Sequence, residues 1–413
     1  MPRVLLILPS STYRASAFLD AASRLGVDVV TGSDQRQTLA HLMGDHFVEL
    51  DLDDPPAAAR TIELLAGRLP LDAVVAVDDV GGLVAALASE RLGLRHNPPA
   101  AIAVTRDKRA MRALVDAGGL EQPAWRAVGG AGGGEADLVA AAAAELGFPA
   151  VVKPCSLSGS RGVIRVDSPA EAAAAAARVR SILTDAGGSP DEPLLVEEFV
   201  PGAEVALEGL VRDGTLEVLA VFDKPDPLDG PFFEETIYVT PSRLPAAAAG
   251  SVHRLVAAAV EAIGLREGPV HAEVRLAADG RGPVLLEVAA RTIGGNCARA
   301  LRFSTGASLE ELVLAQYLGA GGPVVRERTA SGVMMIPIPR SGRLVEVRGL
   351  ERARAVDHVT GVEIAIPPGR RVDALPEGDR YLGFVFARAD TPEVVEQALR
   401  DAHGVLEVEI AVA

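Results

Sequence analysis

Cysteine and positive charge are both scarce in this chain of 413 residues. The two cysteines, Cys155 and Cys297, exclude a disulfide framework, and we expect each to be a small buried apolar residue. Lys and Arg total 40 against 56 Asp and Glu, and the net charge of -16 argues against a nucleic-acid backbone as partner. Any phosphate site must therefore be built from individually placed lysines and arginines.

Long apolar runs are also missing, although 49% of the residues are hydrophobic. No uninterrupted run approaches the ~20 residues that a membrane helix needs, and the run Val4–Leu8 is too short for a signal peptide. No GxGxxG follows this first strand, so a dinucleotide-binding fold is not indicated. Of the seven histidines only His41 and His46 lie close together, without a nearby cysteine, which argues against a zinc site. We expect a cytoplasmic protein that contacts no membrane.

The order of apolar strands and helices predicts three regions. Residues 1–98 alternate strand and helix, which indicates a parallel α/β domain whose sheet is covered on both faces. Residues 99–324 contain one helix over roughly 99–118, a small α+β lid over about 120–200, and a larger antiparallel sheet. Residues 325–413 have short strands and one clear helix, and are expected to form a C-terminal α+β subdomain.

Two acidic strands, His271–Val274 and Leu285–Val288, carry the strongest chemical signal. A turn separates them, so antiparallel pairing would place Glu273 and Glu287 on one face, close enough to share a metal ion. Arg291 follows shortly afterwards. Two carboxylates and an arginine suit an Mg²⁺-nucleotide site, because Mg²⁺ prefers carboxylate and phosphate oxygens at ~2.1 Å. The alternative is two partly exposed glutamates beside a solvated arginine.

A lysine and a Ser/Gly-rich turn form a second motif. Lys153 lies in an apolar strand, where an unpaired charge is costly. The turn after it supplies hydroxyls and backbone N–H groups that can surround a phosphate chain. Its candidate phosphate-binding residues are Ser156, Ser158, Gly159, Ser160 and Gly162. The alternative is an ordinary hairpin with a lysine at its edge.

A third motif is a strand that ends in a bend. The strand carries Glu197, Glu198, Phe199 and Val200, and its backbone can offer N–H and C=O groups to a purine edge. Glu204 follows the bend and could bind ribose hydroxyls. The alternative is a strand end with solvated acids.

Taken in order, these motifs and Lys108 resemble the ATP-grasp superfamily of carboxylate–amine ligases, over roughly residues 95–320. The resemblance implies that Lys108 and Lys153 bind the nucleotide and that residues 156–162 form a mobile loop over its phosphates. It implies an adenine strand at Glu197–Val200, a ribose ligand at Glu204, and Mg²⁺, with Mn²⁺ as the alternative, on Glu273 and Glu287. Arg291 would steady the substrate carboxylate and the transferred phosphoryl group.

The stretch from Glu287 to Arg291, followed by Gly294 and Gly295, is similar to the branch that contains bacterial L-amino-acid ligases. Ala289 stands where many superfamily members have an asparagine that assists a second metal ion. Residues 230–242 resemble the loop that holds the substrate amine in this branch, with Glu235 as the amine ligand and Tyr238 in place of a histidine. The implied catalytic set is Arg291, Glu235, Gly294 and Gly295.

The resemblance implies that ATP converts a small-molecule carboxylate into an acyl phosphate, which an amine then attacks. The products are an amide or dipeptide, ADP and phosphate, and a homodimer is expected. One alternative is a ligase that joins a non-amino-acid carboxylate to an amino acid or ammonia. Another is a regulatory protein that binds nucleotide without catalysis, as Ala289 and Tyr238 would allow. The presence of both lysines, both carboxylates and Arg291 favours an enzyme.

Overall fold

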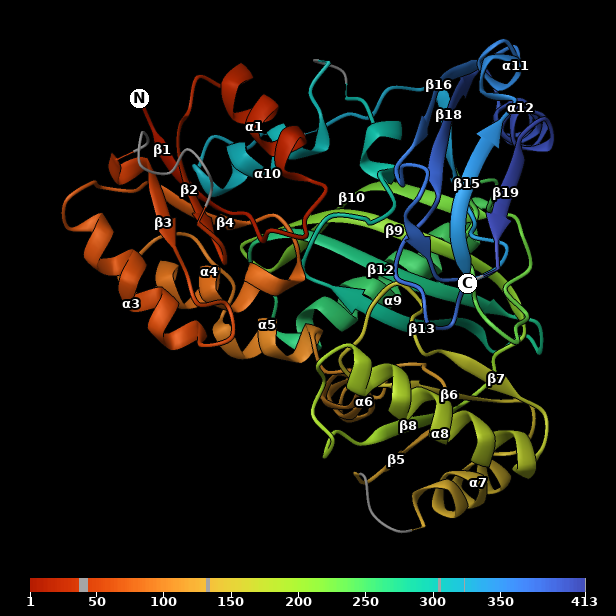
Figure 1. Cartoon of the computed structure of the whole chain (residues 1–413). Helices are drawn as coiled ribbons and strands as arrows, with labels where there is room; N and C mark the ends of the chain where they lie inside the picture. Colours follow the sequence, from red (N-terminus) through yellow and green to blue (C-terminus); the bar gives the residue numbers. More distant parts are fainter. Residues whose placement is uncertain (37–43, 131–133, 304–305, 323, 413) are drawn as a thin grey trace.

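A computed structural model describes residues 1–36, 44–130, 134–303, 306–322 and 324–412; His41 lies outside these ranges. The N-terminal region is a parallel sheet of order β3-β2-β1-β4 (Figure 1). Its strands are β1 (Arg3–Ile7), β2 (Asp28–Ser33), β3 (Phe47–Glu49) and β4 (Ala73–Ala76). The helices α3 (Pro55–Ala66) and α4 (Asp79–Leu92) cover one face, and α1 (Ala15–Arg24) and α10 (Leu309–Tyr317) cover the other. The expected two-sided parallel α/β domain is confirmed, although α10 comes from far along the chain.

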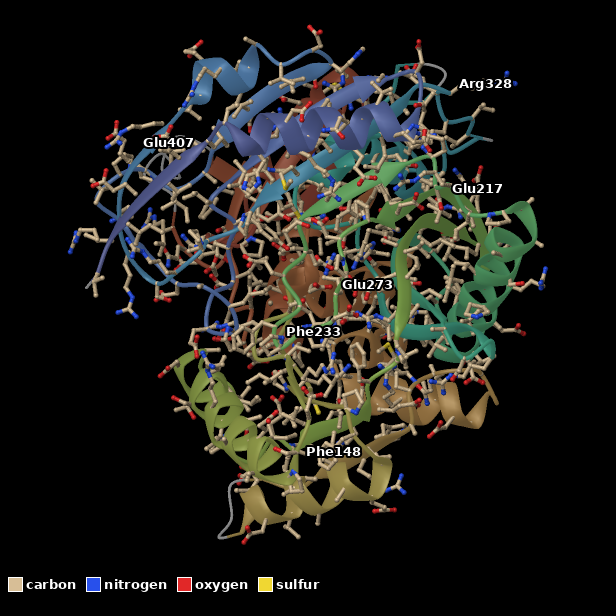
Figure 2. The ribbon with its side chains drawn as sticks, turned by 90° about the vertical axis from the view of Figure 1, so that its right-hand side faces the viewer. Phe148, Glu217, Phe233, Glu273, Arg328 and Glu407 are labelled. Atoms are coloured by element: carbon tan, nitrogen blue, oxygen red, sulfur yellow. The ribbon has the colours of Figure 1, made fainter. Side chains whose placement is uncertain are left out.

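The lid, residues 120–200, is the small α+β module that the sequence predicts. Its sheet has the order β5-β8-β6-β7, and helices α7 and α8 pack against it (Figure 1). The elements are β5 (Trp125–Val128), α7 (Glu135–Leu146), β6 (Ala150–Pro154), β7 (Ile164–Val166), α8 (Pro169–Asp185) and β8 (Leu194–Glu198). Figure 2 shows the lid as the yellow and olive layer at the bottom of the view, below the labelled Phe233 and Glu273.

The central feature is an eight-stranded sheet of order β13-β12-β9-β10-β11-β14-β18-β16. Its first five strands in that order are β13 (Gly282–Ala289), β12 (Gly268–Ala277), β9 (Gly202–Arg212), β10 (Thr215–Lys224) and β11 (Ile237–Thr240). The other three are β14 (Ala330–Ile336), β18 (Gly383–Ala389) and β16 (Val359–Ile364). Strands predicted for residues 99–324 and 325–413 thus share one continuous sheet, because β11 pairs with β14 across the expected boundary.

The remaining C-terminal elements pack on the end of this sheet. A three-stranded sheet has the order β17-β15-β19, and α12 packs against β14 and β18. The elements are β15 (Gly342–Arg348), α11 (Leu350–Arg354), β17 (Arg371–Val372), α12 (Pro392–Gly404) and β19 (Glu407–Ala411). Short 3-10 turns occur at η1 (Gly44–His46) and η2 (Cys297–Ala300).

Alternation along the central strands gives the sheet one apolar and one polar face. In a strand, neighbouring side chains point to opposite faces. Val270, Ala272 and Val274 of β12 accordingly lie in the apolar core beneath α9 (Ala246–Ile263), while His271 and Glu273 point to the opposite face. By length and composition alone α9 is the one helix of the described chain that could cross a membrane, with 28% of its residues buried. In this fold its apolar residues cover the sheet.

The prediction of a single helix over roughly 99–118 is wrong. The structure has α5 (Pro99–Thr105) and α6 (Lys108–Ala117), separated by Arg106 and Asp107. The Asp107 carboxylate accepts hydrogen bonds from the N–H groups of Arg109 (2.9 Å) and Ala110 (3.1 Å), which caps a new helix start. The break places Lys108 at the first position of α6, facing the central sheet. Cys155 and Cys297 are both buried free thiols, as expected.

Gly202 is the glycine on which the approach of β9 to β12 depends. Its φ is +140°, and a Cβ there would lie 2.0 Å from the carbonyl oxygen of Leu276 in the partner strand. We predict that Gly202→Ala lowers the free energy of unfolding by about 2 kcal/mol or more, measured by urea denaturation. Gly67→Ala is the control, since Gly67 has a φ of -63° and a Cβ there would make only ordinary contacts, 3.5 Å or more from its neighbours. Equal stability of the two variants would contradict this role of Gly202.

Candidate active site

Rows of polar side chains cross the central sheet on the face opposite α9. Glu204 of β9 lies beside Lys224 of β10 on one side and Arg275 of β12 on the other. In the next row Glu273 lies beside Ala206, and one row beyond that Glu208 lies beside His271. These residues come from separate stretches of sequence, and only strand register brings them together.

Glu273 and Glu287 lie directly opposite each other on β12 and β13, as the sequence predicts. Their side chains are 24% and 28% exposed, so both remain accessible to a ligand. The Lys108 ammonium lies 3.4 Å from the Glu287 carboxylate and donates a hydrogen bond to the Leu157 carbonyl (2.7 Å). Lys108 therefore links the start of α6, the predicted phosphate loop (residues 156–162) and this carboxylate pair.

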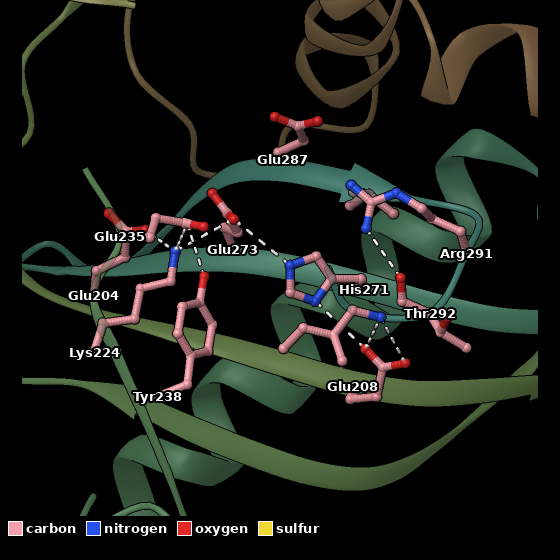
Figure 3. A network of polar contacts seen from close by, with 12 residues as sticks. Glu204, Glu208, Lys224, Glu235, Tyr238, His271, Glu273, Glu287, Arg291 and Thr292 are labelled. Carbon is pink, nitrogen blue, oxygen red and sulfur yellow. Dashed lines mark hydrogen bonds and ion pairs between the residues drawn. The ribbon is translucent and has the colours of Figure 1, made fainter. Parts of the chain in front are cut away.

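Lys224 is the centre of the site, although the sequence analysis assigned it no role. Its ammonium lies 2.6 Å from Glu204, 2.5 Å from Glu235 and 3.3 Å from Glu273 (Figure 3). Burial alone would lower the pKa of Lys224, but the three carboxylates raise it well above its ordinary value. Lys224 is therefore a permanent cation that holds three acids within reach of one another.

The same cluster sets the charge state of its acids. Burial raises the pKa of Glu235 above its ordinary value. Burial acts in the same direction on Glu273, but Lys224 and His271 hold its pKa well below the ordinary value. Tyr238 donates a hydrogen bond to Glu235 (2.7 Å), and burial together with that acid raises the pKa of Tyr238 well above its usual range. Tyr238 is therefore a donor and not a base at neutral pH.

A buried histidine connects this cluster to the loop that carries Arg291. His271 lies 3.6 Å from Glu273 and 3.4 Å from the fully buried Glu208. Glu208 in turn accepts a hydrogen bond from the Ile293 N–H group at 3.1 Å. A hydrogen-bonding partner behind a carboxylate, such as His271 behind Glu273, fixes the orientation in which that carboxylate can meet a ligand.

Arg291 is fixed by the N-terminal domain. Its Nε lies 2.5 Å from the Asp79 carboxylate at the start of α4, and its Nη1 donates to the Thr292 carbonyl (3.0 Å). Burial alone would lower the pKa of Arg291, but the Asp79 carboxylate raises it above its ordinary value. Arg14 supports the same loop through the Thr292 hydroxyl and the Ile293 carbonyl (2.9 Å).

Gly294 and Gly295 lie in this loop next to the N-terminal domain. The Gly295 N–H group donates to the Tyr13 hydroxyl at 3.1 Å, and a Cβ on Gly294 would lie 3.7 Å from the same hydroxyl. The structure thus places the glycine pair beside Arg291, on a loop that residues from the first domain hold in place.

Lys153 and Glu197 form a buried ion pair at the base of the lid. Lys153 lies 2.7 Å from Glu197, and Arg112 of α6 binds the same carboxylate at 2.7 and 3.2 Å. Burial disfavours both charges, and it lowers the pKa of Lys153. Burial alone would raise the pKa of Glu197, but Arg112 and Lys153 outweigh this effect and lower that pKa to about 2. The Glu197 side chain, predicted to line an adenine site, is engaged in positioning Lys153.

The rest of the predicted adenine strand leads from the lid to the central sheet. Glu198 pairs with Arg281 at 2.5 Å. Phe199 stacks on Phe233 with ring centroids 6.2 Å apart, and the Val200 carbonyl accepts a hydrogen bond from Arg275 at 2.8 Å. Glu204, the predicted ribose ligand, uses one oxygen for Lys224 and the other for Arg275 (2.9 Å).

The phosphate loop connects β6 to β7 above the carboxylate pair. Ser156 donates to Glu192 from both its N–H group (2.9 Å) and its hydroxyl (2.7 Å), which anchors the start of the loop. Gly159, Ser160 and Gly162 adopt positive φ values of 65°, 57° and 72°. The N–H groups in the second half of the loop are already bonded, that of Gly162 to the Pro376 carbonyl (2.9 Å) and that of Val163 to the Ser160 carbonyl (3.1 Å). The predicted phosphate contact of the Gly162 N–H group is therefore not available in this structure.

Several residues of this site were missed by sequence reasoning. The sequence analysis assigned no role to Asp79, Lys224 or His271. A lysine within an apolar strand was the available signal for Lys224, since such a charge needs partners. Arg112 and Arg14 carried no recognisable pattern.

Three stretches of the chain match known domain families. Residues 146–300 match the ATP-grasp domain, residues 19–96 the ATP-grasp N-terminal domain, and residues 334–411 the L-amino acid ligase C-terminal domain 2. The third match begins within β14 and runs to the end of β19, including α12.

Individual proteins show the same likeness. The chain is 28% identical over 311 residues to alanine–anticapsin ligase of Bacillus subtilis, which covers 70% of this chain and 64% of that protein. It is 30% identical over 323 residues to carnosine synthase 1 of Gallus gallus, covering 72% and 34%. The structure superposes on the L-amino acid ligase from Bacillus licheniformis with a TM-score of 0.80 at 24% identity, covering 100% and 99%. The chain thus spans less than two thirds of the length of these two relatives compared by sequence.

The buried pair at the lid base gives a pH-dependent prediction. The folded-state pKa of Glu197, about 2, lies below its ordinary value of 4.5. The contribution of ionised Glu197 to the free energy of unfolding is therefore complete above pH 4.5 and is lost as the pH falls toward 2. We expect Glu197→Gln to lower the free energy of unfolding by roughly 3 kcal/mol at pH 7, and by about half as much at pH 3. Urea denaturation at both pH values measures this difference.

Glu145→Gln is the matched control, because Glu145 forms an exposed lid ion pair with Arg126 at 2.5 Å. It should leave the unfolding midpoint unchanged at either pH. A difference between wild type and Glu197→Gln that stays constant from pH 7 to pH 3 would contradict the low pKa of Glu197.

Proposed function

We propose that this ATP-grasp chain is an ATP-dependent ligase that joins a carboxylate, preferably that of an amino acid, to an amine and releases ADP and phosphate. One observation carries the proposal: Glu273 and Glu287 face each other on adjacent strands, and Lys224 and Lys108 contact them. Acids that can hold a metal ion, surrounded by fixed cations, are what phosphoryl transfer requires, because its catalysis consists mainly of positioning and charge stabilisation.

The donor set fits Mg²⁺, with Mn²⁺ as the alternative. Glu273 has a pKa well below its ordinary value and is therefore ionised, as a ligand of a hard cation must be. Glu273 and Glu287 would hold the ion, which when bound would neutralise charge on the phosphates of ATP. Ala289 offers no ligand atom, so a second ion would depend on Glu287 itself, on water or on another side chain.

The nucleotide would lie between the lid and the central sheet. Lys153 comes from the lid, Lys108 from α6, and the phosphate loop lies near both, since the Leu157 carbonyl accepts a hydrogen bond from Lys108. Glu204 can bind a ribose hydroxyl without releasing Lys224 or Arg275, because each carboxylate oxygen accepts two hydrogen bonds. Val200, just past β8, would offer its N–H group to adenine. The predicted adenine strand itself cannot, because β8 lies between β5 and β6 and its backbone groups pair with both neighbours.

Arg291 would hold the carboxylate substrate. The ion pair with Asp79 and the bond to the Thr292 carbonyl fix its guanidinium before any ligand arrives, so little side-chain entropy is lost on binding. A carboxylate oxygen of the substrate would attack the γ-phosphorus, and the bond from that phosphorus to ADP would break. Gly294 and Gly295 would allow the substrate to approach the backbone closely.

Glu235 would bind the amine through its second carboxylate oxygen. Oε1 already accepts from Lys224 (2.5 Å) and Tyr238 (2.7 Å), whereas Oε2 has a longer contact of 3.4 Å with the Tyr381 hydroxyl. The amine nitrogen would attack the acyl carbon, phosphate would leave, and the nitrogen would lose a proton. Tyr238 keeps Glu235 in place and is not the acceptor of that proton.

The lid would protect the acyl phosphate from water during this second step. The identity of both substrates, a homodimeric state, a cytoplasmic location and the lack of nucleic-acid or membrane partners remain predictions. Besides Arg291, the residues that select the two substrates would come from the N-terminal domain, the loop before β11 and the C-terminal region.

The proposal is tested by incubating the protein with Mg²⁺-ATP and every pair of common amino acids. ADP and phosphate release is measured, and products are identified by mass spectrometry. We expect release that depends on the pair, together with a product whose mass equals the sum of two amino acids minus water. ATP binding without release for any carboxylate–amine pair, including non-proteinogenic ones, would contradict a ligase.

Glu287→Gln tests the site within the same assay. It should bind ATP but lose at least about 99% of turnover, because the loss of one metal carboxylate removes several kcal/mol of transition-state stabilisation. Glu217→Gln is the matched control, since Glu217 is a partly exposed glutamate on β10 of the same sheet, paired with Arg212. Near-normal turnover of Glu287→Gln would exclude Glu287 as a metal ligand.

A further inference from the structure

Residues 373–381, here called the strap, connect β17 to β18 and contact both halves of the proposed active site. The strap belongs to the C-terminal region, more than 190 residues after the phosphate loop in the chain. It touches the phosphate loop at one end and Glu235 at the other. The roles assigned above to the nucleotide and amine residues do not use it.

The first end of the strap holds the end of the phosphate loop. The Gly162 N–H group donates to the Pro376 carbonyl at 2.9 Å, and Arg161 donates through Nε to the Glu377 carbonyl at 3.0 Å. The Glu377 side chain binds Arg178 of α8 with two contacts of 2.6 and 3.0 Å. Two parallel N–H to carboxylate bonds fix orientation as well as distance.

The other end of the strap reaches the amine ligand. Tyr381 places its hydroxyl 3.4 Å from Oε2 of Glu235, and its ring packs edge-on against Phe384 with centroids 6.1 Å apart. A small cavity lies between the strap and the phosphate loop, and its lining includes Gly159, Ser160, Glu235, Arg380 and Tyr381. The strap is thus one wall of the space in which an amine on Glu235 would meet the phosphate loop.

We propose that the strap positions the phosphate loop and the amine ligand relative to each other, with Glu377 and Tyr381 as its positioning residues. This inference rests on the proposed function. Glu377 holds the lid against the C-terminal region, and Tyr381 aims Oε2 of Glu235 into the cavity. An acyl phosphate formed under the loop would then be shielded from water while the amine is held beside it. Loosening the strap should therefore favour hydrolysis over amide formation.

The first test reverses the charge at Glu377. Glu377→Arg turns the attraction to Arg178 into repulsion and should lower the amide formed per ADP by about threefold or more. Arg178→Glu should do the same, and the double variant with both charges exchanged should restore the wild-type ratio. Glu145→Arg is the control, because Glu145 pairs with Arg126 on the lid, away from the strap. An unchanged ratio in Glu377→Arg, or no restoration in the double variant, overturns the role of Glu377.

A second readout does not depend on the ligase activity. The dissociation rate of Mg²⁺-ADP should rise about threefold or more in Glu377→Arg and return to the wild-type rate in the double variant. If wild type forms no amide with any pair but this rate behaves as stated, the proposed function fails and the strap attachment stands. If amide forms and the rate is unaffected, the attachment fails and the proposed function stands.

Tyr381→Phe tests the amine end of the strap. Removing the hydroxyl should raise the KM for the amine severalfold while the KM for ATP stays unchanged, because only the orientation of Glu235 is affected. A purely structural role of Tyr381 would change kcat or both KM values together, and that result, or no change at all, would overturn its assignment.

Discussion

The ammonium of Lys224, buried among Glu204, Glu235 and Glu273, is the interaction around which the site is organised. Three carboxylates so close together would repel one another and could not all stay ionised in a protein interior. A fixed cation at their centre offsets part of that repulsion: the pKa of Glu273 lies well below its ordinary value, while burial and Glu273 keep that of Glu235 raised. It leaves Glu273 ionised for a metal ion and holds Glu235 in place for an amine. The distinct roles proposed for neighbouring acids therefore depend on one lysine.

The surrounding structure keeps this charge cluster in place from several directions. Strand register aligns Lys224, Glu204 and Arg275 across three strands, while α9 covers the opposite face. Asp79 of the N-terminal domain fixes Arg291, and Arg112 of α6 shares Glu197 with Lys153 of the lid. Each of these groups, for which a substrate-binding role is proposed, is thus held by a partner from another part of the chain, which is how a site can be rigid before ligands bind.

The strands and carboxylates of the site could be predicted from the sequence better than the side chains that hold them in place. The pairing of Glu273 with Glu287 followed from two strands and a turn, because both are local signals. The division of the 99–118 helix was missed, since the cap at Asp107 looks like any charged helix position. The partners Arg112 and Asp79 could not be found, because contacts such as Arg291–Asp79 join residues 212 positions apart. Such contacts follow from the packing of whole domains and leave no periodicity in the chain.

The formation of an acyl phosphate is the central claim of this account, and isotope transfer tests it most directly. A carboxylate substrate labelled with ¹⁸O in both oxygens is converted with Mg²⁺-ATP and an amine, and the released phosphate is analysed by mass spectrometry. The account predicts one ¹⁸O atom in phosphate for each amide formed, because the attacking carboxylate oxygen leaves with the phosphoryl group. Phosphate free of ¹⁸O, with amide still formed, would contradict it.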